Sequence, residues 1–208
     1  AKLCGTKYAC GLNSGTDALM LALALSGIRK GDEVITPPNS FIASTAAIVH
    51  IGATPVFVDV LPDQNIDPYK IEASITEKTK AIMPVHLTGR MCDMDPIMDI
   101  AQKYGLAVIE DAAQSVGSKY KGRPSGSIGD VGCFSTHPLK NLNACGDGGF
   151  LTTDDEDIYN KSRSYRSHGM VNRNIVDHFG SVTRMDNLQA SILNYRLDKL
   201  EEVTLKRR

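Results

Sequence analysis

Hydrophobic and polar positions along the chain predict strands and helices in regular alternation. Apolar, β-branched runs are typical of buried strands, and apolar stripes that stop at glycine are typical of helices. The predicted strands are Glu33–Thr36, Pro55–Val60, Lys80–His86, Leu106–Asp111, Val131–Ser135 and Gly148–Thr152. The predicted helices are Asp17–Leu25, Ile42–His50, Pro68–Ser74, Met94–Tyr104, Glu156–Tyr165 and Met185–Arg208. The remaining stretch Val171–Gly180 is polar and is expected to be irregular.

This alternation of strand and helix favours an α/β fold. Consecutive parallel strands joined through helices predict a three-layer sandwich, a mostly parallel sheet with helices on both faces. Ligands of such sheets bind at the carboxyl ends of the strands. The candidate functional residues therefore follow predicted strands, at Pro37–Phe41, His86, Asp111 and Ser135–Lys140.

Composition excludes several classes of protein. The 208 residues carry 23 Lys and Arg against 24 Asp and Glu, a net charge of −1, so no basic surface for nucleic acid is indicated. The longest apolar run, Ala18–Ser26, is far shorter than the ~20 residues of a membrane helix, and the N-terminus lacks the apolar core of a signal peptide. We expect a cytoplasmic protein that binds neither nucleic acid nor membrane.

The five cysteines predict neither a disulfide framework nor a zinc site. They are odd in number and form no Cys-x-x-Cys pair, so we expect reduced thiols and no metal. The chain does not begin with Met, and its first residues approach a strand-to-helix junction. We therefore expect a fragment of a longer protein.

Three features carry chemistry. Ser14-Gly15-Thr16-Asp17 opens a helix whose free amides can bind an anion, although simple helix capping accounts for it equally well. Asp111 ends a buried strand, where a carboxylate needs a partner: a metal, a ribose, a protonated ring nitrogen, or merely an N-cap or salt bridge. Lys140 lies in a glycine-flanked loop five residues after Ser135, although most single lysines are surface charges.

Taken together, the three features match the needs of pyridoxal phosphate. Its phosphate binds helix-end amides and a hydroxyl, its pyridine nitrogen pairs with a carboxylate, and its aldehyde reacts with a lysine amine. The sequence therefore predicts a pyridoxal-phosphate site.

Longer blocks extend this pattern along the chain: Ser14–Leu19, Thr36–Ser44, Glu110–Gln114, Ser135–Asn141, Gly146–Gly149 and Arg184–Ala190. Together they resemble one family, the nucleotide-sugar aminotransferases of the DegT or StrS type, which are fold-type-I pyridoxal-phosphate enzymes. The resemblance extends over essentially all 208 residues. It implies that residues 1–208 form the pyridoxal-phosphate-binding large domain, without the N-terminal segment and the small C-terminal domain of family members.

The resemblance implies roles around the cofactor ring. Lys140 matches the catalytic lysine that binds the cofactor aldehyde, and Asp111 matches the catalytic carboxylate that pairs with the pyridinium nitrogen. Gln114 matches the residue near the phenolic oxygen, and Phe41 the aromatic residue that stacks on the ring. His86 is expected either to support this site or to be a structural histidine.

It also implies how the phosphate is held. Thr16 and Asp17 match the pair whose backbone binds the phosphate, and Ser135 matches its hydroxyl ligand. Val182 stands where many members carry an Asn that reaches the neighbouring subunit's phosphate, and valine has no side-chain donor. The resemblance implies a homodimer with the active site near its interface. Because of Val182, we expect the phosphate to depend mainly on Thr16, Asp17 and Ser135 of its own subunit.

The implied activity is transfer of an amino group from an amino acid, with glutamate the expected donor, to a nucleotide-linked keto-deoxysugar. Such a step belongs to amino-sugar, lipopolysaccharide or other polysaccharide biosynthesis. One family branch has His at the lysine position and dehydrates sugars instead, so Lys140 favours transamination. A sugar dehydratase, another fold-type-I enzyme such as a lyase, and a catalytically impaired cofactor-binding fragment remain alternatives.

Overall fold

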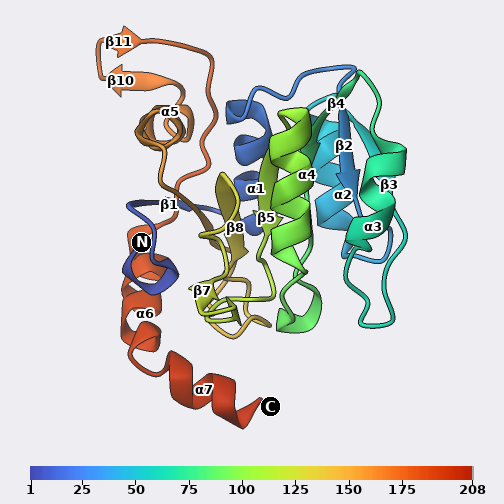
Figure 1. Cartoon of the computed structure of the whole chain (residues 1–208). Helices are drawn as coiled ribbons and strands as arrows, with labels where there is room; N and C mark the ends of the chain where they lie inside the picture. Colours follow the sequence, from blue (N-terminus) through green and yellow to red (C-terminus); the bar gives the residue numbers. More distant parts are fainter. Residues whose placement is uncertain (208) are drawn as a thin grey trace.

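A mixed seven-stranded sheet forms the centre of the computed structural model, which describes residues 1–207 (Figure 1). Its strand order is β1-β9-β8-β5-β4-β2-β3. Only β9 runs against its neighbours, β1 and β8, and all other pairs are parallel. The prediction of a mostly parallel sheet is confirmed. The strands are β1 (Tyr8–Leu12), β2 (Glu33–Thr36), β3 (Thr54–Phe57), β4 (Thr79–Ile82), β5 (Ala107–Asp111), β8 (Val131–Ser135) and β9 (Gly149–Thr153).

Helices cover both faces, which confirms the three-layer arrangement. On one face α1 (Gly15–Leu25), α2 (Ile42–His50) and α5 (Glu156–Tyr165) pack with sheet residues such as Ile109. On the other face α3 (Pro68–Ile71) and α4 (Met94–Tyr104) pack with sheet residues such as Val108. Val108 and Ile109 belong to opposite cores because successive strand residues point to opposite faces. Short 3₁₀ helices lie at η1 (Lys2–Cys4), η2 (Glu72–Ser74) and η3 (Leu87–Gly89).

Several predicted bounds match the structure because a local signal fixes the end of the element. The strands β2 and β8 and the helices α2, α4 and α5 begin and end where the pattern predicts. Asp155 caps α5 by accepting a hydrogen bond from the Ile158 amide at 3.0 Å. Gly105 ends α4 in the left-handed conformation, at a φ of 65°.

The prediction of one helix over Met185–Arg208 is wrong. Two helices occur, α6 (Asn187–Leu197) and α7 (Leu200–Lys206), and Arg208 lies outside the described residues. They lead away from the sheet toward the bottom of Figure 1. Leu193 and Leu200 are buried with Phe134, whereas Leu188 is 70% exposed. The apolar stripe therefore does not pack as one face, and the chain turns between the two helices.

The segment predicted to be irregular contains a short hairpin. Strand β10 (Met170–Asn172) pairs with β11 (Ile175–Val176), and a second small hairpin joins β6 (Lys119–Tyr120) to β7 (Arg123–Pro124). Strands of two or three residues are too short to show a periodic pattern, so the prediction fails there.

The cysteines are free thiols, four buried and Cys145 exposed. Within residues 1–207, no helix combines the length and hydropathy that crossing a membrane requires.

Candidate active site

A cavity of about 460 Å³ lies where the start of α1 meets the carboxyl ends of β5 and β8. Its wall includes the start of α2 and the loop that carries Lys140. Six of the seven residues with a predicted cofactor role line the cavity: Thr16, Phe41, Asp111, Gln114, Ser135 and Lys140. The seventh, Asp17, is not among the lining residues.

The start of α1 presents free backbone donors to the cavity. Ser14 caps the helix, since its Oγ accepts a hydrogen bond from the Asp17 amide at 3.0 Å. The Asp17 side chain turns back and accepts a hydrogen bond from the Ser14 hydroxyl. The N–H groups of Gly15 and Thr16 belong to the first turn, where no preceding carbonyl of the helix is in reach. The serine cap and an anion site therefore coexist here, and the helix dipole favours a negative ligand.

Two glycines allow three segments to meet at this point. A Cβ on Gly15 would lie 2.7 Å from the Ser135 Cβ, and a Cβ on Gly149 would lie 2.3 Å from the carbonyl carbon of Ser14. Any larger residue would separate the first turn of α1 from the end of β8 and the start of β9. The close contact brings the Ser135 hydroxyl beside the free amides of α1.

Asp111 is a buried carboxylate with unused acceptor capacity. Its Oδ2 accepts a hydrogen bond from the Ser44 hydroxyl at 2.6 Å, and its Oδ1 accepts one from the Ala113 amide at 3.1 Å. Burial raises the pKa of Asp111, and the hydrogen bonds from Ser44 and Ala113 oppose that rise. A carboxylate has about four acceptor positions, so Asp111 can take a further N–H donor from a ligand.

Glu110, the preceding residue of β5, faces the opposite side of the sheet. It accepts hydrogen bonds from three backbone amides of the loop 126–129 and from the Nε2 of His86 at 2.9 Å. The Nδ1 of His86 accepts from the Cys92 amide, so Nε2 carries the proton. Burial raises the pKa of Glu110, but these hydrogen bonds outweigh it and leave the pKa below its usual range. His86 is buried and does not line the cavity, which supports the structural interpretation.

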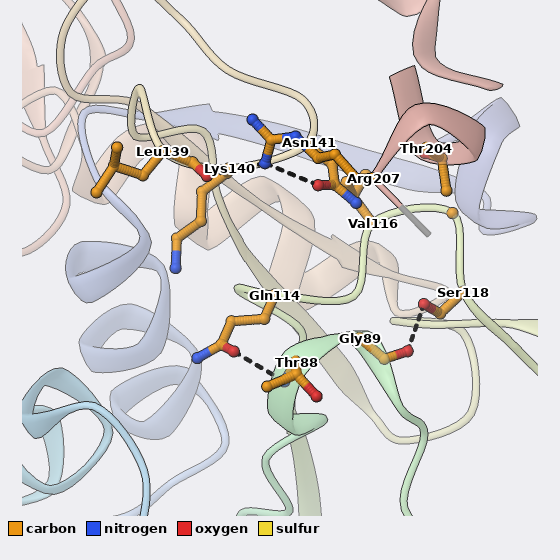
Figure 2. Close-up of a pocket in the computed structure, with 11 residues that line it drawn as sticks. Thr88, Gly89, Gln114, Val116, Ser118, Leu139, Lys140, Asn141, Thr204 and Arg207 are labelled. Atoms are coloured by element: carbon orange, nitrogen blue, oxygen red, sulfur yellow. Dashed lines mark hydrogen bonds between the residues drawn. The ribbon is translucent and has the colours of Figure 1, made fainter. Parts of the chain in front are cut away.

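The loop around Lys140 is fixed by its own turn and by Arg207, the residue that follows α7. The Lys140 amide donates to the His137 carbonyl at 2.8 Å. Arg207 donates from Nη1 to the Leu139 carbonyl at 3.1 Å and to the Asn141 side chain at 3.0 Å. Both neighbours of Lys140 are therefore held, while Figure 2 shows its amine extending away from Arg207.

Gln114 is oriented by the turn after β4. Its Oε1 accepts the Thr88 amide hydrogen at 2.8 Å, so its NH₂ group is directed away from that contact, to the same side as the Lys140 amine (Figure 2). Lys140 and Gln114 also border a second, more polar cavity of about 400 Å³. Phe41, at the N-cap of α2, is 69% exposed, so its ring is available to cover a flat ligand.

These residues fit pyridoxal phosphate. The cavity offers the free amides at the start of α1 for a phosphate, the Asp111 carboxylate with free acceptor positions, and the Lys140 amine. Ser44 also lines the cavity, and sequence reasoning gave it no role. Its only signal was its place in the block Thr36–Ser44.

Comparison with known proteins points the same way. A family model, the DegT/DnrJ/EryC1/StrS aminotransferase family, matches residues 1–208. A UDP-N-acetyl-3-dehydro-alpha-D-glucosamine 3-aminotransferase from Acidithiobacillus ferrooxidans is 50% identical over 196 residues, 93% of this chain and 53% of the relative. The chain thus spans about half the length of that relative.

Two solved structures share the fold. DesV from S. venezuelae matches with a TM-score of 0.94 and 43% identity, over 97% of this chain and 55% of DesV. NtdA from Bacillus subtilis, solved with bound cofactor PMP, matches with a TM-score of 0.87 and 41% identity, over 96% of this chain and 45% of NtdA. With a family model that matches its whole length, the chain belongs to the DegT/DnrJ/EryC1/StrS aminotransferase family.

Proposed function

We propose that the protein is a pyridoxal-phosphate-dependent aminotransferase that moves the amino group of glutamate to a nucleotide-linked keto-deoxysugar. The observation that carries the proposal is that the Lys140 amine and the Asp111 carboxylate border one cavity at the open start of α1. The similarity to an aminotransferase of a UDP-linked sugar supports the substrate class. The pathway would be amino-sugar biosynthesis for lipopolysaccharide or another polysaccharide.

The residues around the ring would divide the chemistry between them. Pyridoxal phosphate, when bound, supplies an aldehyde that exchanges amino groups and a ring that accepts electrons. Lys140 would hold the aldehyde and, once an amino substrate has displaced it, move the proton at the substrate carbon. Asp111 would keep a proton on the ring nitrogen, because a nearby carboxylate favours the charged form. The NH₂ group of Gln114 would donate to the phenolic oxygen, and Phe41 would cover the ring.

The phosphate would sit at the start of α1. The free amides of Gly15 and Thr16 and the hydroxyl of Ser135 supply the donors. The Asp17 amide already donates to Ser14, so its contact with the phosphate stays a prediction. Over both halves of the reaction, glutamate becomes 2-oxoglutarate, and the keto carbon of the sugar becomes a carbon that bears the amino group and one hydrogen.

We also infer the setting of the enzyme. Residues 1–208 would form one pyridoxal-phosphate-binding large domain of a longer protein, which works as a homodimer in the cytoplasm. Free thiols at all five cysteines fit a reducing compartment.

Borohydride reduction tests the site. The purified protein is incubated with pyridoxal phosphate, reduced and digested, and the pyridoxyl group should map to Lys140. Label on Lys119 or Lys161 would contradict the assignment. Lys140→Ala is the control and should remain unlabelled.

A half-reaction with glutamate tests the activity. Glutamate should bleach the absorbance of the bound cofactor and release one 2-oxoglutarate per site, after which a screen of nucleotide keto-sugars should identify an acceptor. A protein that binds the cofactor but never reacts with glutamate would be a cofactor-binding fragment or a dehydratase instead.

A further inference from the structure

We propose that Ser44 is a positioning residue, which holds the Asp111 carboxylate ionised and oriented for the cofactor ring, with Ser40 setting the direction of the Ser44 hydroxyl. This inference rests on the proposed function. Ser44 lies on α2 and Asp111 at the end of β5, 67 residues apart in the chain.

The hydrogen bonds among Ser40, Ser44 and Asp111 can be donated in only one direction, toward Asp111. Ser44 is 1% exposed, and its Oγ lies 2.6 Å from Asp111 Oδ2. An ionised carboxylate only accepts, so the Ser44 hydroxyl must donate to it. The Oγ of Ser40 lies 2.6 Å from the Oγ of Ser44. Because the Ser44 proton is already used, Ser40 donates to Ser44, and a chain of donors runs from half-buried Ser40 to buried Asp111.

Asp111 depends on this chain to remain charged. It is 4% exposed, and its one other described hydrogen-bond donor is the Ala113 amide. Burial favours the neutral acid. The ionisable groups that face it are Lys140 from the loop after β8, His86 from the turn after β4, and Cys133 of β8, which lies beside it in register. A neutral Asp111 could not keep a proton on the ring nitrogen, so loss of the Ser44 donor would weaken the cofactor site.

The position of Ser44 permits a clean substitution. It is the third residue of α2, and its hydroxyl bonds Asp111 rather than the backbone of its own helix. Alanine favours helix, so Ser44→Ala removes the donor with little disturbance of α2. Ser115→Ala is the matched control, because Ser115 is also a buried serine, near Asp111 in sequence, and its hydroxyl bonds the Ala112 carbonyl instead.

The test combines three measurements on each variant. They are the affinity for pyridoxal phosphate by absorbance titration, the pH dependence of the visible band of the bound cofactor, and kcat and KM of the glutamate half-reaction. Ser44→Ala should bind the cofactor about tenfold more weakly, as expected for loss of a hydrogen bond to a charged group. Its visible band should lose the protonated-ring form at lower pH. Ser44→Thr, which keeps the hydroxyl, should restore both, Ser40→Ala should show a smaller loss, and Ser115→Ala should match the parent.

A measurement without cofactor separates this inference from the proposed function. In the apoprotein, carbon-13 NMR of the Asp111 carboxyl should show that its pKa rises in Ser44→Ala and returns in Ser44→Thr. Circular dichroism checks that each variant is folded. A parent chain that fails to bind pyridoxal phosphate would refute the function alone. An Asp111 pKa and a cofactor affinity that are unchanged in folded Ser44→Ala would overturn the positioning role.

Discussion

The adjacent carboxylates of Glu110 and Asp111 on β5 have different roles because successive strand residues face opposite sides of the sheet. Glu110 faces the α4 side, where three backbone amides and His86 donate to its two carboxylate oxygens. Asp111 faces the α1 side, where it keeps acceptor positions open toward a cavity. A shift of one residue in register would exchange them. The pairing of Asp111 with Cys133 of β8 is therefore part of the site.

At this scale, Asp111→Asn should still bind the cofactor, more weakly than the parent, but nearly abolish transamination. The amide keeps the shape of the side chain but carries no charge to hold a proton on the ring nitrogen, and interactions that strengthen toward the transition state govern the chemical rate. Stopped-flow absorbance of the glutamate half-reaction measures the loss. Asp147→Asn, at another acid that lines the cavity, is the control. Near-normal rates in Asp111→Asn would show that Asp111 is structural.

Glu110→Gln should destabilise the protein in a pH-dependent way. The pKa of Glu110 is lowered in the folded state, so its contribution is full above the ordinary glutamate pKa of about 4.3 and is lost as the pH falls through the lower folded pKa. Near neutral pH, the NH₂ group of Gln replaces the oxygen that accepts from the Gly126 amide and the His86 N–H. Both donors then lose their acceptor, at a cost of about 2 kcal/mol or more. Urea unfolding from about pH 7 to 3 should show the gap between variant and parent closing in acid. A gap of constant size, or an equal one in exposed Glu77→Gln, would contradict this account.

Candidate catalytic residues were predictable where their position relative to a strand indicates a binding site. Asp111 ends a buried strand and Lys140 follows one, and ligands bind at the carboxyl ends of parallel strands. Ser44 was not predictable in the same way. Its partner lies 67 residues away, and only the folded packing of α2 against β5 joins them. The roles of Glu110 and His86 also depend on such long-range pairing.

At the scale of the elements, the contact between α1 and β8 is sensitive to a single methyl group. Gly15→Ala would place a Cβ 2.7 Å from the Ser135 Cβ and 3.0 Å from its Cα, so helix and strand must move apart. We expect the free energy of unfolding to fall by about 1–3 kcal/mol, together with weaker binding of the cofactor phosphate. Chemical denaturation and cofactor titration measure the two effects. Gly11→Ala, whose Cβ would meet its nearest neighbour at 3.4 Å, should change neither.

Element boundaries were predictable where a cap or stop fixes them, as at Asp155 and Gly105. They were not predictable where tertiary packing decides. The apolar stripe of the last segment continues across Asp198 and Lys199, although the chain turns there. The hairpin of β10 and β11 was not predictable either, because strands of three and two residues are too short to show an alternating pattern.

For the whole molecule, we expect a dimer in solution. The segment after α5 exposes Val171, Ile175, Val176 and Val182, and Phe179 is 99% exposed. Large exposed apolar patches are typically covered by association. Light scattering at micromolar concentration should give the mass of two chains, and Phe179→Asp should lower it. Tyr69→Asp, at another exposed aromatic residue, should not. A monomer that still holds the cofactor would contradict the expected dimer and show that one chain completes the cofactor site.

The pairing of β1 with β9 also constrains the order of events during synthesis. Tyr8 pairs with Thr153, so strand β1 has no partner in the sheet until β9 has been made. The two residues that follow β1, Asn13 and Ser14, lead directly into the anion-binding turn of α1. That turn cannot be anchored before Gly149 arrives beside Ser14. The phosphate site is therefore completed only after β9 has joined the sheet. Binding of the cofactor phosphate then signals that β1 and β9 have paired.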